Sequence, residues 1–284
     1  MACQEVEIMK IAKILTFILI IIIIASSVVY FKFFRSNVVD AQLHIESPEV
    51  KVNNIPVSGN IKLKENDIIE TTNGLATIIL HESILIALDK NTKVSLSDLK
   101  NKHPKVFQES GSTWNKFIRI SGVEDYTLTT SNTVASIRGT AFGLIEGNIL
   151  GDWKCLVGEN EIDYNIDSQD FIIEKNYVVD KVLEKIEKRP ATPEELEYIN
   201  GRNKRIVSEL KYLRQLKIDK LPNKVKYGLT DQEIQQKLEE ADQGNINVDE
   251  VMSKFPVNLP LLNEIAEITK EIQSLNQELN DKEY

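Results

Sequence analysis

An uncharged apolar run near the N-terminus constrains this chain more than any other feature of its sequence. The run extends from Ile14 to Phe31, ILTFILIIIIIASSVVYF, and holds 18 residues without a charge. As an α-helix it would span about 27 Å, close to the hydrocarbon thickness of a bilayer. Lys13 and Lys32 close its ends, where their long side chains can reach the polar interface. The run therefore predicts one transmembrane helix at 14–31, with the lipid bilayer as a partner.

A cleaved signal peptide is the main alternative for this run, with Ala25-Ser26-Ser27 near a cleavage site. Its apolar core is usually about 7–15 residues long, however, which is shorter than the run observed. Two basic residues precede the run and two follow it, so the positive-inside count is a tie. A short tail before a long folded region is typical of a signal anchor. We therefore expect a single-pass protein of the cell membrane, with residues 1–13 in the cytoplasm and the remainder outside.

The region 38–180 has the pattern of β-strands. ATIIL and ILIAL are short apolar runs, whereas YTLTT and TVASI alternate or favour β-branched and aromatic residues. The turn compositions TTNG, DKNT and VSGN separate such runs. The region holds 13 Lys and Arg against 21 Asp and Glu, and this acidic balance argues against a nucleic-acid partner. It is predicted to be an all-β domain, built as a sandwich or a roll.

The region 181–284 changes to helical patterns. Thr192 followed by Pro193 and Glu195 predicts a helix start with a capping box, and Thr230 with Glu233 predicts a second one. Apolar residues recur at helical spacing after the first box. They are Leu196, Ile199, Ile206, Leu210 and Leu213.

A third helix is predicted after Pro260, with apolar residues at heptad spacing over 260–282. This stripe has two interpretations. It packs on the other two helices as a bundle, or it mediates self-association or binds a partner helix as a coiled coil. So few heptads are marginal alone, which favours the bundle. The residues of the stripe are Leu261, Ile265, Ile268, Ile272, Leu275 and Leu279.

A search for catalytic and ligand-binding motifs yields no candidate residues. The nucleophile elbow, the zinc-protease helix and the two glycine-rich nucleotide-binding motifs are missing from the sequence. His44, His81 and His103 are isolated, and Cys3 and Cys155 lie on opposite sides of the apolar run. We therefore nominate no catalytic, cofactor-binding or metal-binding residue. A non-enzymatic protein without a cofactor is expected.

Two further stretches have a functional and a structural interpretation. The loop 239–250 resembles half of an EF-hand around Gly244, but Ala241 falls at a ligand position, which favours a connection between helices. The stretch 202–226 holds nine Lys and Arg against Glu209 and Asp219. It would suit nucleic acid or anionic lipid if it faced the cytoplasm, and otherwise it is the solvated face of an amphipathic helix.

The stretch TVASIRGTAFGL, Thr133 to Leu144, is strand-like on both sides of Arg138 and Gly139. We expect a corner here, with Gly139 at a bulge or a close-packing point. Arg138 is expected to face solvent or pair with a carboxylate, and Thr140 to lie in a strand. A phosphate-binding loop would need more glycines and a helix N-terminus, so a structural role is favoured.

An ordered set of segments resembles the FecR domain family. The segments are Asn66 to Thr71, Gly74 to Leu88, Thr127 to Leu144 and Val157 to Glu159, within a region from about Ile45 to Tyr177. The resemblance implies an elongated all-β domain, roll-like or helix-like, displayed outside the cytoplasmic membrane. In the best-known members a cytoplasmic N-terminal segment binds a sigma factor, and a C-terminal part meets an outer-membrane transducer.

Two departures from that family plan shape the functional prediction. Only 13 residues precede the apolar run, which is too few for a folded sigma-binding domain, and the C-terminal region is helical. We therefore expect a membrane-anchored extracytoplasmic FecR-like binding or scaffold protein that recognises a protein or cell-envelope partner. The alternative is a transmembrane signal-transduction regulator of the FecR type that lacks the usual cytoplasmic domain.

Overall fold

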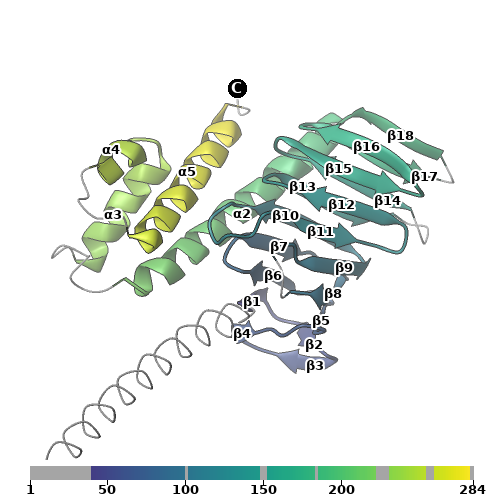
Figure 1. The fold of residues 1–284 in the computed structure, drawn as a ribbon, viewed down its shortest axis with the longest axis horizontal. Helices are drawn as coiled ribbons and strands as arrows, with labels where there is room; N and C mark the ends of the chain where they lie inside the picture. The colour runs from purple at the N-terminus through teal and green to yellow at the C-terminus, as the bar shows by residue number, and fades with distance from the viewer. Residues whose placement is uncertain are drawn as a thin grey trace, which may run out of the picture. The chain divides into compact units, whose positions relative to one another are not determined.

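Two β-sheets and a group of helices make up the described part of this protein. The computed structural model describes residues 40–99, 102–147, 152–182, 185–221, 230–253 and 259–281. Within these residues, strands β1 to β18 come first along the chain and helices α2 to α5 follow. The strands lie in two layers, and α2 runs along one of these layers (Figure 1).

Sheet A is the layer that meets the helices, and it contains nine of the described strands. Its hydrogen-bonded neighbours follow a regular spatial order. From one edge to the other, that order is β18 (Lys185–Pro190), β17 (Tyr177–Val182), β14 (Trp153–Val157), β13 (Ala141–Glu146), β10 (Ser112–Phe117), β7 (Ile84–Leu88), β6 (Leu75–Leu80), β1 (Ala41–Ser47) and β4 (Ile61–Lys62).

Sheet B is the second layer and also contains nine of the described strands. β9 and β11 are parallel neighbours, whereas β12 runs antiparallel to both β11 and β15. The order is β16 (Gln169–Glu174), β15 (Glu161–Ile166), β12 (Thr133–Ile137), β11 (Tyr126–Thr129), β9 (Lys105–Ser110), β8 (Lys93–Asp98), β5 (Ile68–Thr71), β2 (Val50–Val52) and β3 (Ile55–Val57).

The chain passes back and forth between the two sheets, mostly in pairs of strands. β6 and β7 lie in sheet A, β8 and β9 lie in sheet B, and β10 returns to sheet A. From β11 onward each successive pair changes sheet. The stack therefore lengthens as the chain proceeds, from β1 to β4 at one end to β16 to β18 at the other.

The burial of the strands explains the two kinds of apolar pattern in the sequence. β6 and β7 of sheet A are buried at almost every residue, because one face meets sheet B and the other meets the helices. β12 and β15 of sheet B bury alternate residues, since one of their faces is exposed. A strand that is covered on both faces has a continuous apolar sequence, whereas a strand that is covered on one face alternates apolar and polar residues. The predicted all-β character of this region is confirmed.

Helix α2 (Pro193–Asp219) begins as the sequence predicts. The hydroxyl of Thr192 accepts from the backbone N–H of Glu195, and the Glu195 carboxylate accepts from the backbone N–H of Thr192. This exchange satisfies two backbone donors that the first turn of a helix leaves open. The predicted stripe is buried from Ile199 to Leu213, with Leu196 partly buried at its N-terminal end.

The stripe of α2 packs on the outer face of sheet A. Ile199, Ile206 and Leu210 share one core cluster with Leu85 of β7 and Trp114 of β10. The indole N–H of Trp114 donates to the side-chain oxygen of Asn203, 3.1 Å away, so the large aromatic ring also has its polar atom satisfied. Sheet A and α2 therefore form one hydrophobic core.

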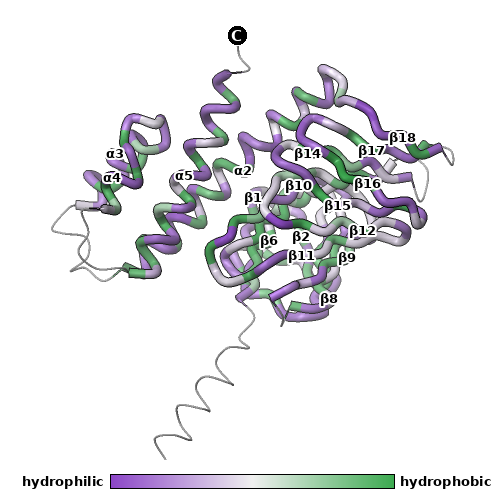
Figure 2. Tube along the Cα trace, turned by 45° about the horizontal axis from the view of Figure 1, so that its top comes forward, coloured by the Kyte–Doolittle hydropathy of each residue, from purple (hydrophilic) through white to green (hydrophobic). Residues whose placement is uncertain are grey.

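Helix α5 (Pro260–Asn280) packs along α2, with α3 (Asp231–Asp242) and α4 (Val248–Ser253) against its other side (Figure 1). The heptad stripe is used inside the chain, because Ile268, Ile272 and Leu275 are fully buried in the cluster that contains α2. Figure 2 shows apolar residues interspersed with polar ones along both helices. The bundle interpretation of the stripe is the one the structure favours.

A row of glutamates on α5 recurs every seven residues, on the side that meets cations of other elements. Glu264 pairs with Lys217 of α2, Glu271 pairs with Lys116 of β10, and Glu278 pairs with a lysine in the turn before β17. A spacing of seven places side chains on one helix face. We call Glu264, Glu271 and Glu278 the acidic row of α5.

Two expectations about organisation are corrected by the structure. Strands continue past residue 180, since β17 crosses it and β18 ends at Pro190. The predicted transmembrane helix at 14–31 lies outside the described residues, as does the tail at 1–13, and no helix within them has the length and apolar character needed to cross a membrane. The transmembrane part of the predicted fold class, and the predicted single-pass membrane location, therefore have no support.

Candidate functional site

The stretch Thr133–Leu144 forms the corner through which the chain passes from one sheet to the other. β12 ends at Ile137 in sheet B, and β13 starts at Ala141 in sheet A. Arg138, Gly139 and Thr140 join them, and Gly139 has a φ of +104°. That backbone conformation is open to glycine and strained for residues with a side chain. A bulge and close packing were the two expected reasons for this glycine, and close packing is not one of them, because an added Cβ would meet only the Nε of Arg119, at 3.7 Å. The backbone conformation explains the glycine.

The three carbonyl groups of this corner are all held by donors from neighbouring segments. The carbonyl of Arg138 accepts from the Arg119 guanidinium at 2.6 Å, and that of Gly139 accepts from the Asn160 amide at 2.7 Å. The carbonyl of Thr140 accepts from the backbone N–H of Phe117 at 3.1 Å. The corner is therefore fixed by the ends of β10 and β14.

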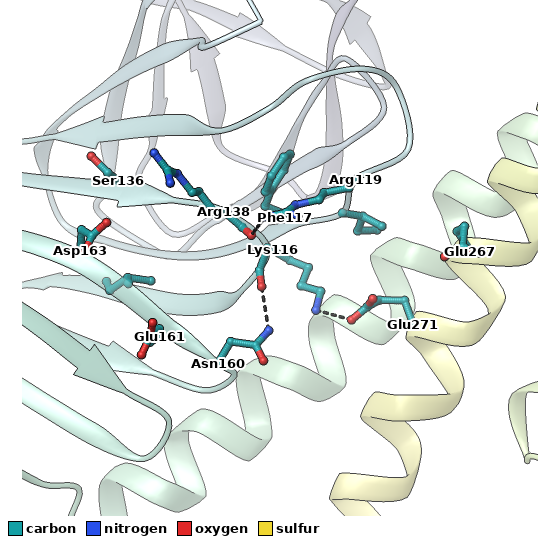
Figure 3. Close-up of a pocket in the computed structure, with 13 residues that line it drawn as sticks. Lys116, Phe117, Arg119, Ser136, Arg138, Asn160, Glu161, Asp163, Glu267 and Glu271 are labelled. Atoms are coloured by element: carbon teal, nitrogen blue, oxygen red, sulfur yellow. Dashed lines mark hydrogen bonds and ion pairs between the residues drawn. The ribbon is translucent and has the colours of Figure 1, made fainter.

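A pocket of about 590 Å³ lies beside this corner, between the sheets and α5 (Figure 3). Its walls come from three segments of the β region and from one face of the last helix. We call it the corner pocket. Its lining residues are Lys116, Phe117, Ile118, Arg119, Ser136, Arg138, Gly139, Asn160, Glu161, Ile162, Asp163, Glu267 and Glu271.

A buried ion cluster forms the helix side of the corner pocket. The ammonium of Lys116 donates to the carboxylates of Glu159 and Glu271, and Lys116 is only 2% exposed. Burial opposes the charge on Lys116, but the two carboxylates outweigh it and raise its pKa. Burial likewise raises the pKa of Glu159, although Lys116 opposes this shift. The two carboxylates account for the raised pKa of Lys116, and burial accounts for the raised pKa of Glu159.

Four other charged side chains of the corner pocket carry no ion pair within the described residues. Arg138 is exposed as predicted, and Arg119 is also exposed, with its one hydrogen bond going to a backbone carbonyl. Glu161 and Asp163 project from the exposed face of β15. The pocket therefore presents both signs of charge to solvent.

The isolated histidines stay apart in the structure, and each has a local partner. His44 pairs with Glu209, which raises the His44 pKa, and its ring stacks on Tyr212 with centroids 3.9 Å apart. His103 contacts Asp125, and the ring of His81 contacts a backbone carbonyl. Among the described residues, no three potential metal ligands come together, and the loop around Gly244 connects α3 to α4.

Cys155 is fully buried on β14, and burial raises the pKa of its thiol. A raised pKa keeps a thiol protonated, which makes it a poor nucleophile and a poor metal ligand. The other cysteine of the sequence, Cys3, lies outside the described residues. Cys155 is therefore part of the core.

The basic stretch 202–226, described as far as residue 221, serves to attach α2 to its neighbours. The guanidinium of Arg205 contacts Glu46 at 2.6 Å and Asp89 at 2.9 Å, and it also donates to two carbonyls of sheet A. Arg214 pairs with Asp242 of α3 at 2.6 Å. Neither nucleic-acid binding nor simple solvation describes these side chains, because their charges are used within the fold.

The sequence interpretation found only part of the corner pocket. It singled out Arg138 and Gly139, but it assigned no site to them. The sequence interpretation assigned no role to Asn160 or to the acidic row of α5, although glutamates recur at every seventh position of the predicted helix. Arg119 carries no signal of its own, because its role depends on which strands become neighbours.

Two crystal structures of a candidate anti-sigma factor from Parabacteroides distasonis are similar to part of this chain. The first, at 1.65 Å resolution, is 12% identical with a TM-score of 0.40 and covers 46% of this chain. The second, at 2.50 Å resolution, is 11% identical with a TM-score of 0.41 and covers 51% of this chain. This chain matches 62% of the first structure's chain, less than two thirds, and 73% of the second. No family model and no curated protein matches the chain, so it is assigned to no family.

Proposed function

We propose that this chain is a non-enzymatic binding or scaffold protein of the FecR-like type, and that it recognises a protein partner at the corner pocket. The proposal is carried by one observation: the backbone of the pocket wall is held by hydrogen bonds, while several charged side chains on that wall form no ion pair among the described residues. Arg119 and Asn160 hold the backbone of the corner, while Arg138, Glu161 and Asp163 have no ion-pair partner among the described residues.

A rigid wall with open charged groups suits recognition, because little conformational entropy is lost when a partner binds. The pocket volume of about 590 Å³ falls within the range of about 300–1,000 Å³ that is usual for ligand sites. Its two faces come from the β layers and from α5, so both regions of the chain contribute to one surface.

The use of the buried titratable groups supports a non-enzymatic role. Lys116 is bound to the carboxylates of Glu159 and Glu271, and Lys217 is bound to those of Glu82 and Glu264. Charged side chains that are committed to structural ion pairs inside the fold are not free to act on a substrate.

A photo-crosslinking residue placed in the full-length chain tests the proposal. We expect the reagent at position 136, which lines the pocket and carries none of its charges, to give a discrete protein adduct in cells. The same reagent at the exposed Lys64 is the control, because Lys64 follows β4 at the far end of the stack. Identical adduct patterns from the two positions, or no adduct at position 136, would contradict recognition at the corner pocket.

A further inference from the structure

Three of the four uncommitted charges of the corner pocket, Arg138, Glu161 and Asp163, are placed by the pairing of β12 with β15, whereas Arg119 follows β10. Ser136 lies opposite Asp163 in this antiparallel pair. Extending the register by two residues brings position 138, just past the end of β12, opposite position 161 at the start of β15. Residues two apart on a strand share one face. Arg138 therefore flanks the same exposed surface as Glu161 and Asp163.

The guanidinium groups and the carboxylates on this exposed surface do not pair with each other. The structure has no ion pair between Arg138 and either Glu161 or Asp163, and none between these acids and Arg119, within the described residues. The other two acids of the lining are engaged elsewhere, since Glu271 binds Lys116 and Glu267 pairs with Lys270. The free charges are thus two guanidinium groups on the corner side and two carboxylates on β15.

The geometry points to a specific kind of partner. We propose that the corner pocket binds a protein segment that carries an acidic and a basic side chain within a few residues of each other. The acidic side chain contacts the guanidinium groups of Arg119 and Arg138, and the basic side chain contacts the carboxylates of Glu161 and Asp163. This inference rests on the proposed function, which it deepens by naming the chemistry of the partner.

The donor and acceptor groups fit this division. A guanidinium has five N–H donors in a planar fork that matches a carboxylate, and only one hydrogen bond of Arg119 is used, to the carbonyl of Arg138. Glu161 and Asp163 lie about 7 Å apart along one strand face, so one ammonium group can sit between them. A ligand that carries charges of only one sign would be repelled by the two pocket side chains of that same sign.

Electrostatic repulsion distinguishes a segment with both charges from other possible ligands of this pocket. A nucleic acid or another polyanion would be repelled by Glu161 and Asp163, and the chain as a whole carries a net charge of −9. A purely basic peptide would be repelled by Arg119 and Arg138. A segment with both signs meets attraction on both sides of the pocket.

Four fluorescein-labelled heptapeptides test the inference with the full-length protein. The mixed peptide has the order Gly-Gly-Asp-Gly-Lys-Gly-Gly, and the others replace Asp by Asn, Lys by Gln, or both. We expect the mixed peptide to bind most tightly in fluorescence polarisation. Its affinity should exceed that of the neutral peptide by at least about fivefold, the upper range for one exposed ion pair. Free aspartate and lysine should not compete at the same concentration.

Two double variants assign each charge to its side of the pocket. Arg119→Gln with Arg138→Gln should abolish the advantage that Asp gives the peptide, and Glu161→Gln with Asp163→Asn should abolish the advantage that Lys gives. Lys64→Gln is the control and should change neither. All four positions are exposed, and glutamine at position 119 keeps an N–H donor for the Arg138 carbonyl, so each variant is expected to keep its melting temperature.

Equal affinity for all four peptides would overturn the inference, and so would competition by the free amino acids. If the adduct at position 136 still forms in that case, the proposed function stands and only the charge rule fails. Loss of both the adduct and the peptide binding would reject the two together.

Discussion

Lys116 of β10 and Glu271 of α5 are 155 residues apart in the chain, and they form an ion pair on the wall of the corner pocket. The same ammonium group also binds Glu159, just beyond the end of β14. One buried cation thus joins two segments of the β region to the last helix. Because α5 forms part of the pocket wall, this contact also fixes the shape of the candidate site.

Replacing Lys116 by Met should strongly destabilise the protein. The substitution leaves the carboxylate of Glu159 buried without its cation, and breaking a buried pair in this way typically costs about 3–5 kcal/mol. The free energy of unfolding from urea denaturation of the full-length chain measures the loss.

Glu271→Gln is the matched control for Lys116→Met, because Glu159 keeps its cation in that variant. We expect a loss of about 1.5 kcal/mol, the lower end of the range for a hydrogen bond to a charged group. If Lys116→Met is as stable as the Glu271 variant, the buried Glu159 carboxylate does not depend on the charge of Lys116.

The stability of the start of α2 should depend on pH through Glu195. Hydrogen bonds from Arg189 and Lys154 lower the Glu195 pKa from an ordinary 4.5 to about 2, against the opposing effect of burial. A lowered folded-state pKa contributes stability that is present above pH 4.5 and is lost as the pH falls through about 2. Glu195→Gln should therefore cost about 1 kcal/mol at pH 7.

The difference between wild type and Glu195→Gln should shrink as the pH falls from 4.5 towards 2, in thermal melts at matched ionic strength. The glutamine oxygen can still accept from the backbone N–H of Thr192, so the variant removes the charge and keeps the cap. Glu197→Gln removes a charge from the exposed side of α2 and is the control. A difference that stays constant with pH would show that the Glu195 charge is not responsible.

At the corner between the sheets, removing an exposed side chain should have little effect on stability, whereas a residue that does not suit the backbone conformation should destabilise the protein. Gly139→Val forces a β-branched residue into a φ of +104°, which should cost about 1–3 kcal/mol. Arg138→Ala at the neighbouring exposed position should stay within about 0.5 kcal/mol of wild type. Thermal melting that gives the reverse order would contradict this account of the corner.

A glycine of β13 makes room for the indole ring of Trp114 in the core. A Cβ at Gly143 would lie 2.5 Å from Cε3 of Trp114, its cross-strand partner. The ring cannot easily yield, because it is buried and its N–H is bound to Asn203. Gly143→Ala should therefore cost about 1–3 kcal/mol and change the tryptophan emission spectrum.

Gly201→Ala provides a comparison of opposite sign for this prediction. Gly201 lies exposed within α2 with no atom within 4 Å of an added Cβ, so alanine there should stabilise by about 0.5–1 kcal/mol. If Gly143→Ala leaves both the stability and the emission unchanged, the ring has more freedom than the structure indicates.

Local features of the fold could be read from the sequence because their causes are local. The capping boxes at Thr192 and Thr230 each depend on residues three apart, and both are present. The difference between ILIAL, a continuous run, and TVASI, an alternating one, reflects how many faces of each strand are covered. The sequence predicted that these segments are strands, but it did not predict which sheet each one joins.

The pairing of distant segments could not be read in the same way. Arg205 and Glu46 are 159 residues apart, and nothing near either residue indicates the other. For the same reason the arginines of α2 could be mistaken for a free basic surface. The corner pocket depends on such distant contacts, since Arg119, Asp163 and Glu267 meet only after both sheets and α5 have assembled.

The back-and-forth path of the strands has a consequence for how the chain can form during synthesis. Each pair of strands lies beside pairs made shortly before it, so both layers can be built as the chain emerges from the ribosome. The outer face of sheet A, with Leu85 and Trp114, has to wait for α2, which begins only at Pro193. A nascent chain that ends before α2 thus exposes a wide apolar surface, which favours aggregation until the helix covers it.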